Sequence, residues 1–157
     1  MMYTAITLNG DTDIYFNDQL LFRCLTIKGF FKSKFYIEDV SKRKLLELEI
    51  RDFLGFNKKY FLKRHCFEKE VDLYKFKSKL CLKVDNDIIL LNKKIRPWKF
   101  EGDFIVNNKK TGCFKNKLTF FESSFTFDFY SDINTNIYCI LLFSILVIDE
   151  FNTQPST

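Results

Sequence analysis

The chain has a single histidine, His65, which is followed directly by Cys66. A histidine that takes the proton of a neighbouring thiol forms the simplest catalytic pair for acyl or thiol transfer. Adjacent residues of a β-strand point to opposite faces, however, so we expect a half-exposed His65 and a small, buried Cys66 that do not meet. With one histidine and no GxSxG motif, a serine triad also lacks support. The sequence therefore predicts no catalytic residue and no enzyme.

Acidic residues and cysteines offer no better site. Glu47 with Glu49, and Glu101 with Asp103, are spaced to share a strand face, but acids amid many lysines are usually solvated rather than glycosidase pairs. The Asp85-Asn86-Asp87 segment lacks the glycine and glutamate of a calcium loop and indicates a hairpin turn. Five cysteines without a CxxC spacing predict neither a zinc site nor a disulfide framework, and no Walker A or GxGxxG motif occurs. We expect no metal and no cofactor.

Positive charge is the strongest chemical signal. Between Lys28 and Lys117 lie 24 of the 25 Lys and Arg residues, but only 12 of the 20 acids. The short basic clusters near turns are the candidate anion-binding residues: Lys42, Arg43, Lys44, Lys58, Lys59, Lys93, Lys94 and Arg96. If they converge on one end of the molecule, phosphate groups are the natural partner. The alternative is a solvated exterior of scattered lysines.

Composition narrows the protein class. The 157 residues suffice for one domain, and 46% hydrophobic residues exclude intrinsic disorder. The unusual figure is 20 phenylalanines, within 18% aromatic residues, which favours β structure. The N-terminus has neither a basic region nor a long apolar stretch, so no secretory signal is expected, and a reducing cytoplasm is the simplest location.

Apolar and polar residues alternate with period two over most of the chain, as in residues 46–50, 80–84 and 125–129. Such alternation predicts strands with one apolar and one wet face. Asn9-Gly10 and residues 41–43 and 107–110 are typical of the turns between them. About ten to twelve antiparallel strands are therefore expected between Tyr15 and Tyr130.

Residues 137–148 break this pattern, because only Ser144 among them is conventionally polar. The Asn and Thr residues just before this stretch are good helix N-caps. A helix of twelve residues is about 18 Å long, against roughly 30 Å of bilayer hydrocarbon, so no transmembrane span is expected. A helix that is apolar all round must be buried on all sides. We predict a closed antiparallel β-barrel around it, with a two-sheet sandwich carrying the helix across one open end as the alternative.

This combination resembles the tubby C-terminal superfamily, and within it the LURP-one-related proteins. The resemblance rests on residues 98–104 (WKFEGDF), on the aromatic strand 125–130 (FTFDFY) and on the apolar run 137–148 followed by Asp149-Glu150. It implies a barrel of about twelve strands around a central helix at 136–149, spanning residues 1–152, with a disordered tail at 153–157. The lipid-contacting basic pattern of the larger tubby proteins has no counterpart that can be placed on this chain.

The resemblance implies a non-catalytic binding or scaffold module whose ligand and partners the sequence does not identify. The alternative function is a peripheral membrane protein that binds anionic lipid headgroups through a basic rim. Nucleic acid is the less favoured partner, since Tyr60, Phe61 and Trp98 would have to stack on bases, and strand aromatics more often belong to the core. The expected location is the cytoplasm, with the membrane surface as the second site.

Overall fold

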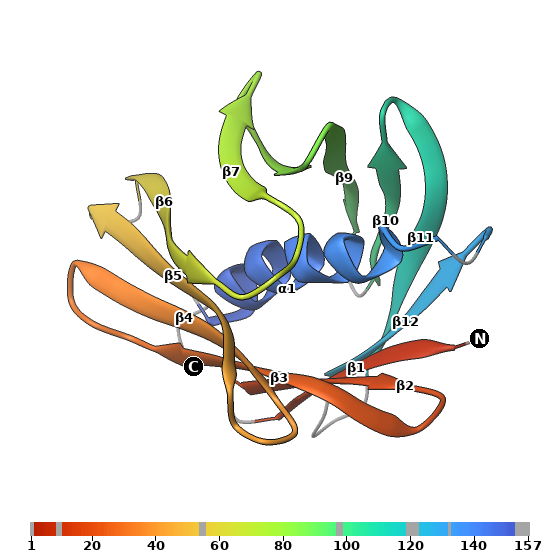
Figure 1. Cartoon of the computed structure of the whole chain (residues 1–157), viewed down its shortest axis with the longest axis horizontal. Coiled ribbons are helices and arrows are strands. Elements are labelled where there is room, and N and C mark those ends of the chain that lie inside the picture. The colour runs from red at the N-terminus through yellow and green to blue at the C-terminus, as the bar shows by residue number, and fades with distance from the viewer. Residues whose placement is uncertain are drawn as a thin grey trace.

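The fold is described from a computed structural model, which covers residues 2–8, 11–53, 56–96, 99–118, 123–131 and 133–152. The expected tail at 153–157 lies outside the described residues, as does Trp98. These residues form twelve strands and one helix, shown in Figure 1. Their bounds are β1 Tyr3–Leu8, β2 Asp11–Phe16, β3 Gln19–Ile27, β4 Lys32–Asp39, β5 Lys44–Phe53, β6 Phe56–His65, β7 Val71–Phe76, β8 Lys79–Val84, β9 Asp87–Arg96, β10 Lys99–Val106, β11 Lys109–Leu118, β12 Ser123–Phe129 and α1 Asn136–Asn152.

All twelve strands belong to one antiparallel sheet, in the order β6-β5-β4-β3-β2-β1-β12-β11-β10-β9-β8-β7. The first and last strands pair in register, with Tyr3 opposite Phe127 and Thr7 opposite Ser123. This pairing joins the two halves of the chain and curls the sheet into a nearly closed barrel. The predicted mainly β barrel is confirmed, and the two-sheet sandwich is wrong because one continuous sheet contains every strand.

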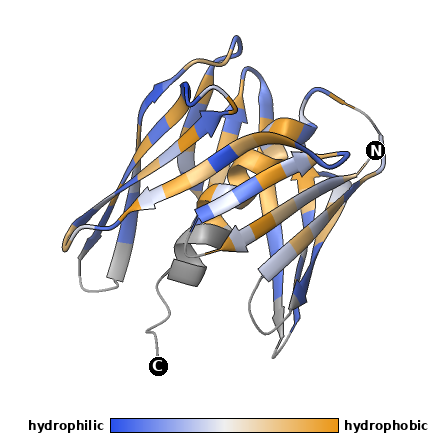
Figure 2. Ribbon diagram, turned by 90° about the horizontal axis from the view of Figure 1, so that it is seen from below, coloured by the Kyte–Doolittle hydropathy of each residue, from blue (hydrophilic) through white to orange (hydrophobic). Residues whose placement is uncertain are grey.

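The helix α1 lies inside the barrel, as Figures 1 and 2 show. Its residues from Tyr138 to Ile145 are all at least 93% buried, including Ser144. The ring of Phe143 is the centre of an aromatic cluster, at 4.9, 5.0 and 4.7 Å from the rings of Phe114, Phe125 and Phe127. The inward faces of the alternating strands and the apolar run therefore form one core, as the sequence predicts.

Some buried polar side chains of the helix form hydrogen bonds, and others are buried without a hydrogen-bond partner among the described residues. The hydroxyl of Ser144 donates to the carbonyl of Ile140 at 2.8 Å, and the side chain also hydrogen-bonds with the buried Cys24 thiol of β3. At the start of α1 the amide of Asn136 donates to the carbonyl of Ser131 at 2.9 Å. The side-chain oxygens of Thr135 and Asn136 accept no hydrogen bond from the described residues, so the expected side-chain N-cap is not formed.

The strand connections alternate between the two ends of the barrel, because each strand runs antiparallel to the next. We call the end at which β3 passes to β4 and β7 passes to β8 the basic end. The strand β6 begins at this end, and β9 finishes there. The connections from β4 to β5 and from β8 to β9 lie at the opposite end.

The strands β6 and β7 are the two ends of the sheet order, and the gap between them is here called the seam. They are consecutive in sequence, and Figure 1 shows the connection between them crossing in front of α1. One described hydrogen bond across the seam is from Lys75 Nζ to the carbonyl oxygen of Lys58, at 2.8 Å. Lysines on the edge strands β6 and β7 disfavour pairing with a strand of another chain. The seam can then be reached by molecules smaller than a strand.

Candidate anion-binding site

The eight predicted anion-binding residues divide between the two ends of the barrel. Lys58 and Lys59 stand at the start of β6, and Lys93 and Lys94 near the finish of β9, so the structure brings these four to the basic end. The backbone of Arg96 also belongs to this end, but its side chain lies outside the described residues.

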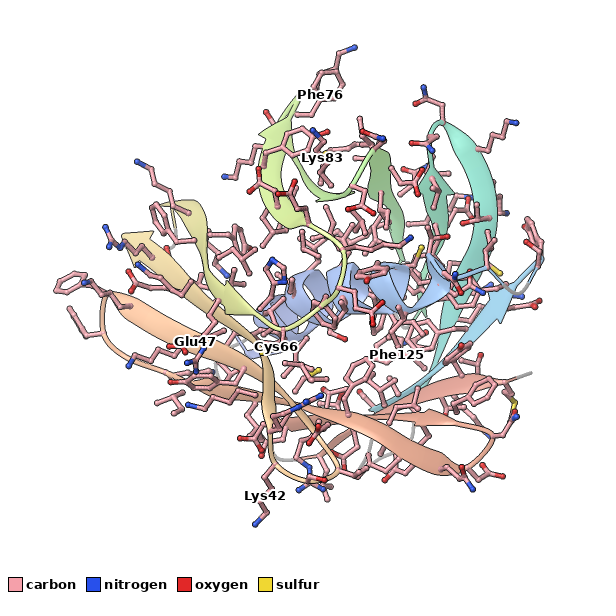
Figure 3. The ribbon with its side chains drawn as sticks, in the orientation of Figure 1. Lys42, Glu47, Cys66, Phe76, Lys83 and Phe125 are labelled. Atoms are coloured by element: carbon pink, nitrogen blue, oxygen red, sulfur yellow. The ribbon has the colours of Figure 1, made fainter. Side chains whose placement is uncertain are left out.

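The Lys42-Arg43-Lys44 cluster lies at the opposite end, on the connection from β4 to β5. Figure 3 shows Lys42 at one extreme of the view and Phe76 of β7 at the other. Arg43 pairs with Asp39 at 3.2 Å, and Lys44 Nζ lies 4.2 Å from the ring centre of Tyr36. Convergence of all the basic clusters on one end is therefore wrong for these three residues, because an odd number of antiparallel strands separates their turn from the turns of the basic end.

The hairpin between β3 and β4 carries a pair of exposed aromatic side chains at the basic end. Phe30 is 88% exposed and Phe31 is 51% exposed, and their rings meet edge to face at 4.5 Å. Lys28, Lys32 and Lys34 flank them, all exposed. We call lysines that surround an exposed aromatic tip in this way a lysine collar. An exposed hydrophobic tip within such a collar is unusual for a turn that contacts only solvent.

The hairpin between β7 and β8 repeats this arrangement at the same end. Phe76 is 55% exposed, with Lys77 Nζ at 5.5 Å from its ring centre and Lys75 and Lys79 on either side. The tetrapeptide Phe-Lys-Ser-Lys occurs in both hairpins, at residues 31–34 and 76–79. Sequence reasoning missed these phenylalanines because it assigned aromatics to the core; the repeated tetrapeptide was the signal available.

The tip of the second hairpin is also held in an unfavourable backbone conformation. Lys77 and Ser78 have φ values of 48° and 64°, in the left-handed region. The corresponding turn at Asn107 and Asn108, with φ of 49° and 66°, uses the residue type that tolerates this region best. A Lys-Ser pair at such a position costs about 1–2 kcal/mol per residue relative to a relaxed backbone. An Asn-Asn pair, as at residues 107–108, would therefore stabilise this turn better than Lys77-Ser78 does.

Two cavities adjoin along the seam at the basic end, and together we call them the seam slot. One has a volume of about 340 Å³ and the other about 290 Å³, and they share Tyr60, Lys75 and Leu80. The first is floored by Leu80, Leu91 and by Leu146 of α1, so it reaches through the seam to the central helix. Among the described residues that line the slot, five are lysines and none is an acid: Lys58, Lys59, Lys75, Lys79 and Lys93.

Two acids that the structure describes near the basic end, Glu49 and Glu101, are paired with basic neighbours. Glu49 binds both Arg51 and Lys63, and its hydrogen bond from Arg51 holds the pKa of the carboxyl below its usual value. Glu101 pairs with Lys99 at 3.4 Å. Neither of these two carboxylates lines the slot.

A third cavity, of about 330 Å³, surrounds His65 at the opposite end. Its other charged residues are of both signs: Glu70, Asp72, Lys83 and Asp85. His65 Nδ1 is buried without a hydrogen-bond partner, and the ring stacks on Phe67 at 6.0 Å. This mixture of charges gives no consistent electrostatic preference for a ligand.

Cys66 differs from its expected burial. The residue is exposed and its thiol lies 3.5 Å from the carbonyl oxygen of Lys44, because the chain has left β6 at this position. All five cysteines are free, as predicted. Burial raises the pKa of the Cys24 and Cys139 thiols to about 12, which makes both of them unreactive core residues.

The remaining acid pairs are bound to bases on the outer face. Glu47 pairs with Arg64 at 3.6 Å, and Asp103 pairs with Lys110 at 2.9 Å and with Lys94 at 4.0 Å. The bond to Asp103 raises the pKa of Lys110. The segment at 85–87 is the expected hairpin turn, with Asp85 at a φ of 52° between β8 and β9.

Within the described ranges, no group of three or more His, Cys, Asp and Glu residues is arranged to hold a metal ion. In the same part of the chain, no helix combines the length and the apolarity that a membrane crossing requires. Comparisons with family models, with curated proteins and with solved structures gave no match.

Proposed function

We propose that this barrel is a non-catalytic binding module of tubby or LURP-one-like type, which docks by its basic end on a bilayer surface that contains anionic lipids. The observation that carries this proposal is the pair of hairpins at one end of the barrel, each with exposed phenylalanine inside a lysine collar. The number of strands and the buried central helix support the type, since the sequence resemblance implies both.

Phenylalanine suits the apolar acyl region of a bilayer, and lysine suits its anionic headgroup region. Burying one phenylalanine in an apolar environment is worth about 1.5–3 kcal/mol, and Phe30, Phe31 and Phe76 are the exposed residues that would gain it. A lysine near an anionic leaflet adds about 1 kcal/mol. Lysine stems also extend along apolar surface while the ammonium stays in water, so a collar of lysines can surround an inserted ring.

The unfavourable Lys77-Ser78 turn supports a role for this tip beyond folding. Asn or Gly at these positions would relax the backbone, but neither would supply the positive charge that Lys77 provides. The seam slot adds five lysines to the same end. Charge and apolar exposure therefore coincide at one end, whereas lysines scattered at random would leave the phenylalanines unexplained.

Co-sedimentation with vesicles tests this proposal. The protein should pellet with phosphatidylcholine vesicles that contain phosphatidylserine and remain in solution with phosphatidylcholine alone. The double variant Phe30→Ser, Phe31→Ser should lose binding at least about tenfold, since each ring contributes more than 1.4 kcal/mol. The matched control is Val40→Ser, which removes an exposed apolar side chain, 66% exposed, from the opposite end.

The outcome that overturns the proposal is equal binding by the double variant and by the parent, or no binding of the parent at low salt. A gel-shift assay with duplex DNA and with RNA is the second arm. Binding of the parent to nucleic acid, unchanged by the two serine substitutions and without vesicle binding, would assign the basic end to nucleic acid instead.

A further inference from the structure

The two copies of the tetrapeptide Phe-Lys-Ser-Lys place their serines in different structural settings. In the copy at residues 31–34, Ser33 lies within β4, opposite Ile50 of β5, and is half-buried. In the copy at residues 76–79, Ser78 lies in the turn between β7 and β8 and is exposed. The structure therefore distinguishes two serines whose nearest neighbours in the sequence are the same.

The sheet also holds the two serines with different firmness. The strand β4 pairs with β3 on one side and with β5 on the other. The strand β7 is the last in the sheet order, and the register between β8 and β9 runs only from Leu82 to Val84. The outer half of the β7–β8 hairpin therefore pairs within itself, and Figure 1 shows its tip projecting from the barrel. Such a segment can open locally while the rest of the barrel stays folded.

The backbone of the turn favours this opening. Lys77 and Ser78 both have positive φ values, of 48° and 64°. The other consecutive pairs of non-glycine residues described with positive φ are Asn17-Asp18 and Asn107-Asn108, which are residue types that tolerate this region. Opening of the Lys77-Ser78 turn relieves strain that an Asn-Asn turn does not store. Ser78 therefore lies where the hairpin opens most easily.

An exposed hydroxyl on a segment that can leave its own fold is what a protein kinase needs, because the kinase must place that hydroxyl in line with the γ-phosphate of ATP. The neighbouring sequence indicates the class of kinase. Lys75, Lys77 and Lys79 surround Ser78 along the chain. Such a pattern suits a kinase whose substrate cleft is acidic.

We propose that Ser78 is a phosphorylation site for a kinase of this class, and that the phosphate releases the basic end from the bilayer. The γ-phosphoryl group of ATP is transferred to Oγ of Ser78, ADP leaves, and a carboxylate of the kinase takes the hydroxyl proton. The phosphate adds about two negative charges to the tip that carries Phe76, whatever other groups surround it. These charges repel an anionic leaflet and bind the ammonium groups of the lysine collar. The release rests on the proposed docking, whereas the modification does not.

Incubation of the whole chain with ATP and the lipid-independent catalytic domain of protein kinase C tests the site, and peptide mass spectrometry locates the phosphate. We expect phosphate at Ser78 and a reaction at least about tenfold slower at Ser33. The variant Ser78→Ala should lose this phosphate, and its matched control Ser33→Ala should keep it. Equal rates at the two serines, or no phosphate at Ser78, would overturn the proposal.

Co-sedimentation with vesicles of phosphatidylcholine and phosphatidylserine tests the release. The chain phosphorylated at Ser78 should bind at least about tenfold more weakly than the unmodified chain, and phosphatase treatment should restore binding. The Ser78→Ala variant, treated with the kinase and ATP in the same way, should bind as the unmodified parent does. Unchanged affinity after phosphorylation of Ser78 would overturn the release and leave the docking standing. Absence of binding by the unmodified parent would overturn the docking and the release together, while phosphate uptake, measured without vesicles, still decides the modification.

Discussion

The ammonium group of Lys75 donates to the carbonyl oxygen of Lys58 at 2.8 Å, and thereby bridges the two strands at which the barrel fails to close. Both residues line the seam slot, so the bond lies at its wall. The barrel is continuous everywhere else in the sheet order, from β6 through the pairing of β1 with β12 to β7. The seam is therefore the place where the structure is expected to open most easily.

Replacement of Lys75 by methionine should loosen the seam without unfolding the barrel. Methionine keeps most of the apolar stem but cannot donate to Lys58, so the edge of β6 loses one of its restraints. Hydrogen exchange should become faster for the amides of β6 and β7 and stay unchanged for β1 and β12. Equal protection of β6 in the variant and the parent would show that the bond does not hold the seam.

Substitutions that relax the backbone of the Lys77-Ser78 turn should raise the stability of the fold and weaken its binding to anionic vesicles. The variant Lys77→Asn, Ser78→Gly places residues that favour positive φ where the backbone already has it, so the free energy of unfolding should rise by about 1 kcal/mol. Removal of one lysine from the tip should at the same time weaken binding to anionic vesicles. Urea denaturation and co-sedimentation measure the two effects. A variant with unchanged vesicle affinity would remove Lys77 from the docking surface.

Truncation of Phe143 to alanine should destabilise the barrel by about 3–5 kcal/mol, because its ring is 99% buried among Phe114, Phe125 and Phe127. Replacement of Leu142 by aspartate should abolish folding, since an unpaired charge would be left in the core. Far-UV circular dichroism during urea denaturation follows both changes. A cooperative transition for the Leu142→Asp protein at the midpoint of the parent would contradict the central position of α1.

Alkaline pH should lower the free energy of unfolding. The pKa of Cys24 and of Cys139 is about 12 in the folded chain, against an ordinary value of 9.0, because both thiols are buried. The unfolded chain therefore loses these protons first, and this contribution to stability, complete below pH 9, disappears as the pH rises toward 12. Tyr138, whose pKa burial also raises, acts in the same direction. A Cys24→Ala, Cys139→Ala variant should show a shallower decline between pH 9 and 11 than the parent, and an identical slope would exclude the thiols as a cause.

Much of the fold could be predicted because the patterns that specify the strands and the helix are local in the sequence. Alternation with period two reports which face of a strand is buried, and the run from 137 to 148 has no polar face to expose. Together these two signals favour a closed sheet around the helix over the two-sheet sandwich. The exposed position of Cys66 was not predictable in this way, since it depends on β6 finishing one residue earlier.

The candidate site was only partly predictable, because strand periodicity does not report which two strands remain unpaired. Lys58 and Lys93 are 35 positions apart in the sequence, and they line one cavity because the sheet order places β6 and β7 at its ends. The same order sends the Lys42 cluster to the opposite end. Phe30 and Phe76 were missed because the usual location of phenylalanine is the core, and only the structure shows which rings the barrel leaves outside.

The most direct measurement of the central claim is the depth of the hairpin tip in a bilayer. A tryptophan is introduced at Phe30 in a Trp98→Phe background, and its fluorescence is recorded with vesicles of phosphatidylcholine and phosphatidylserine that carry brominated acyl chains. The matched control carries tryptophan at Ile133, which is 43% exposed at the opposite end. Docking by the basic end predicts a blue shift and bromine quenching for tryptophan 30, with neither change for the control. Bound protein in which both positions respond alike, or in which only the control is quenched, would contradict the account.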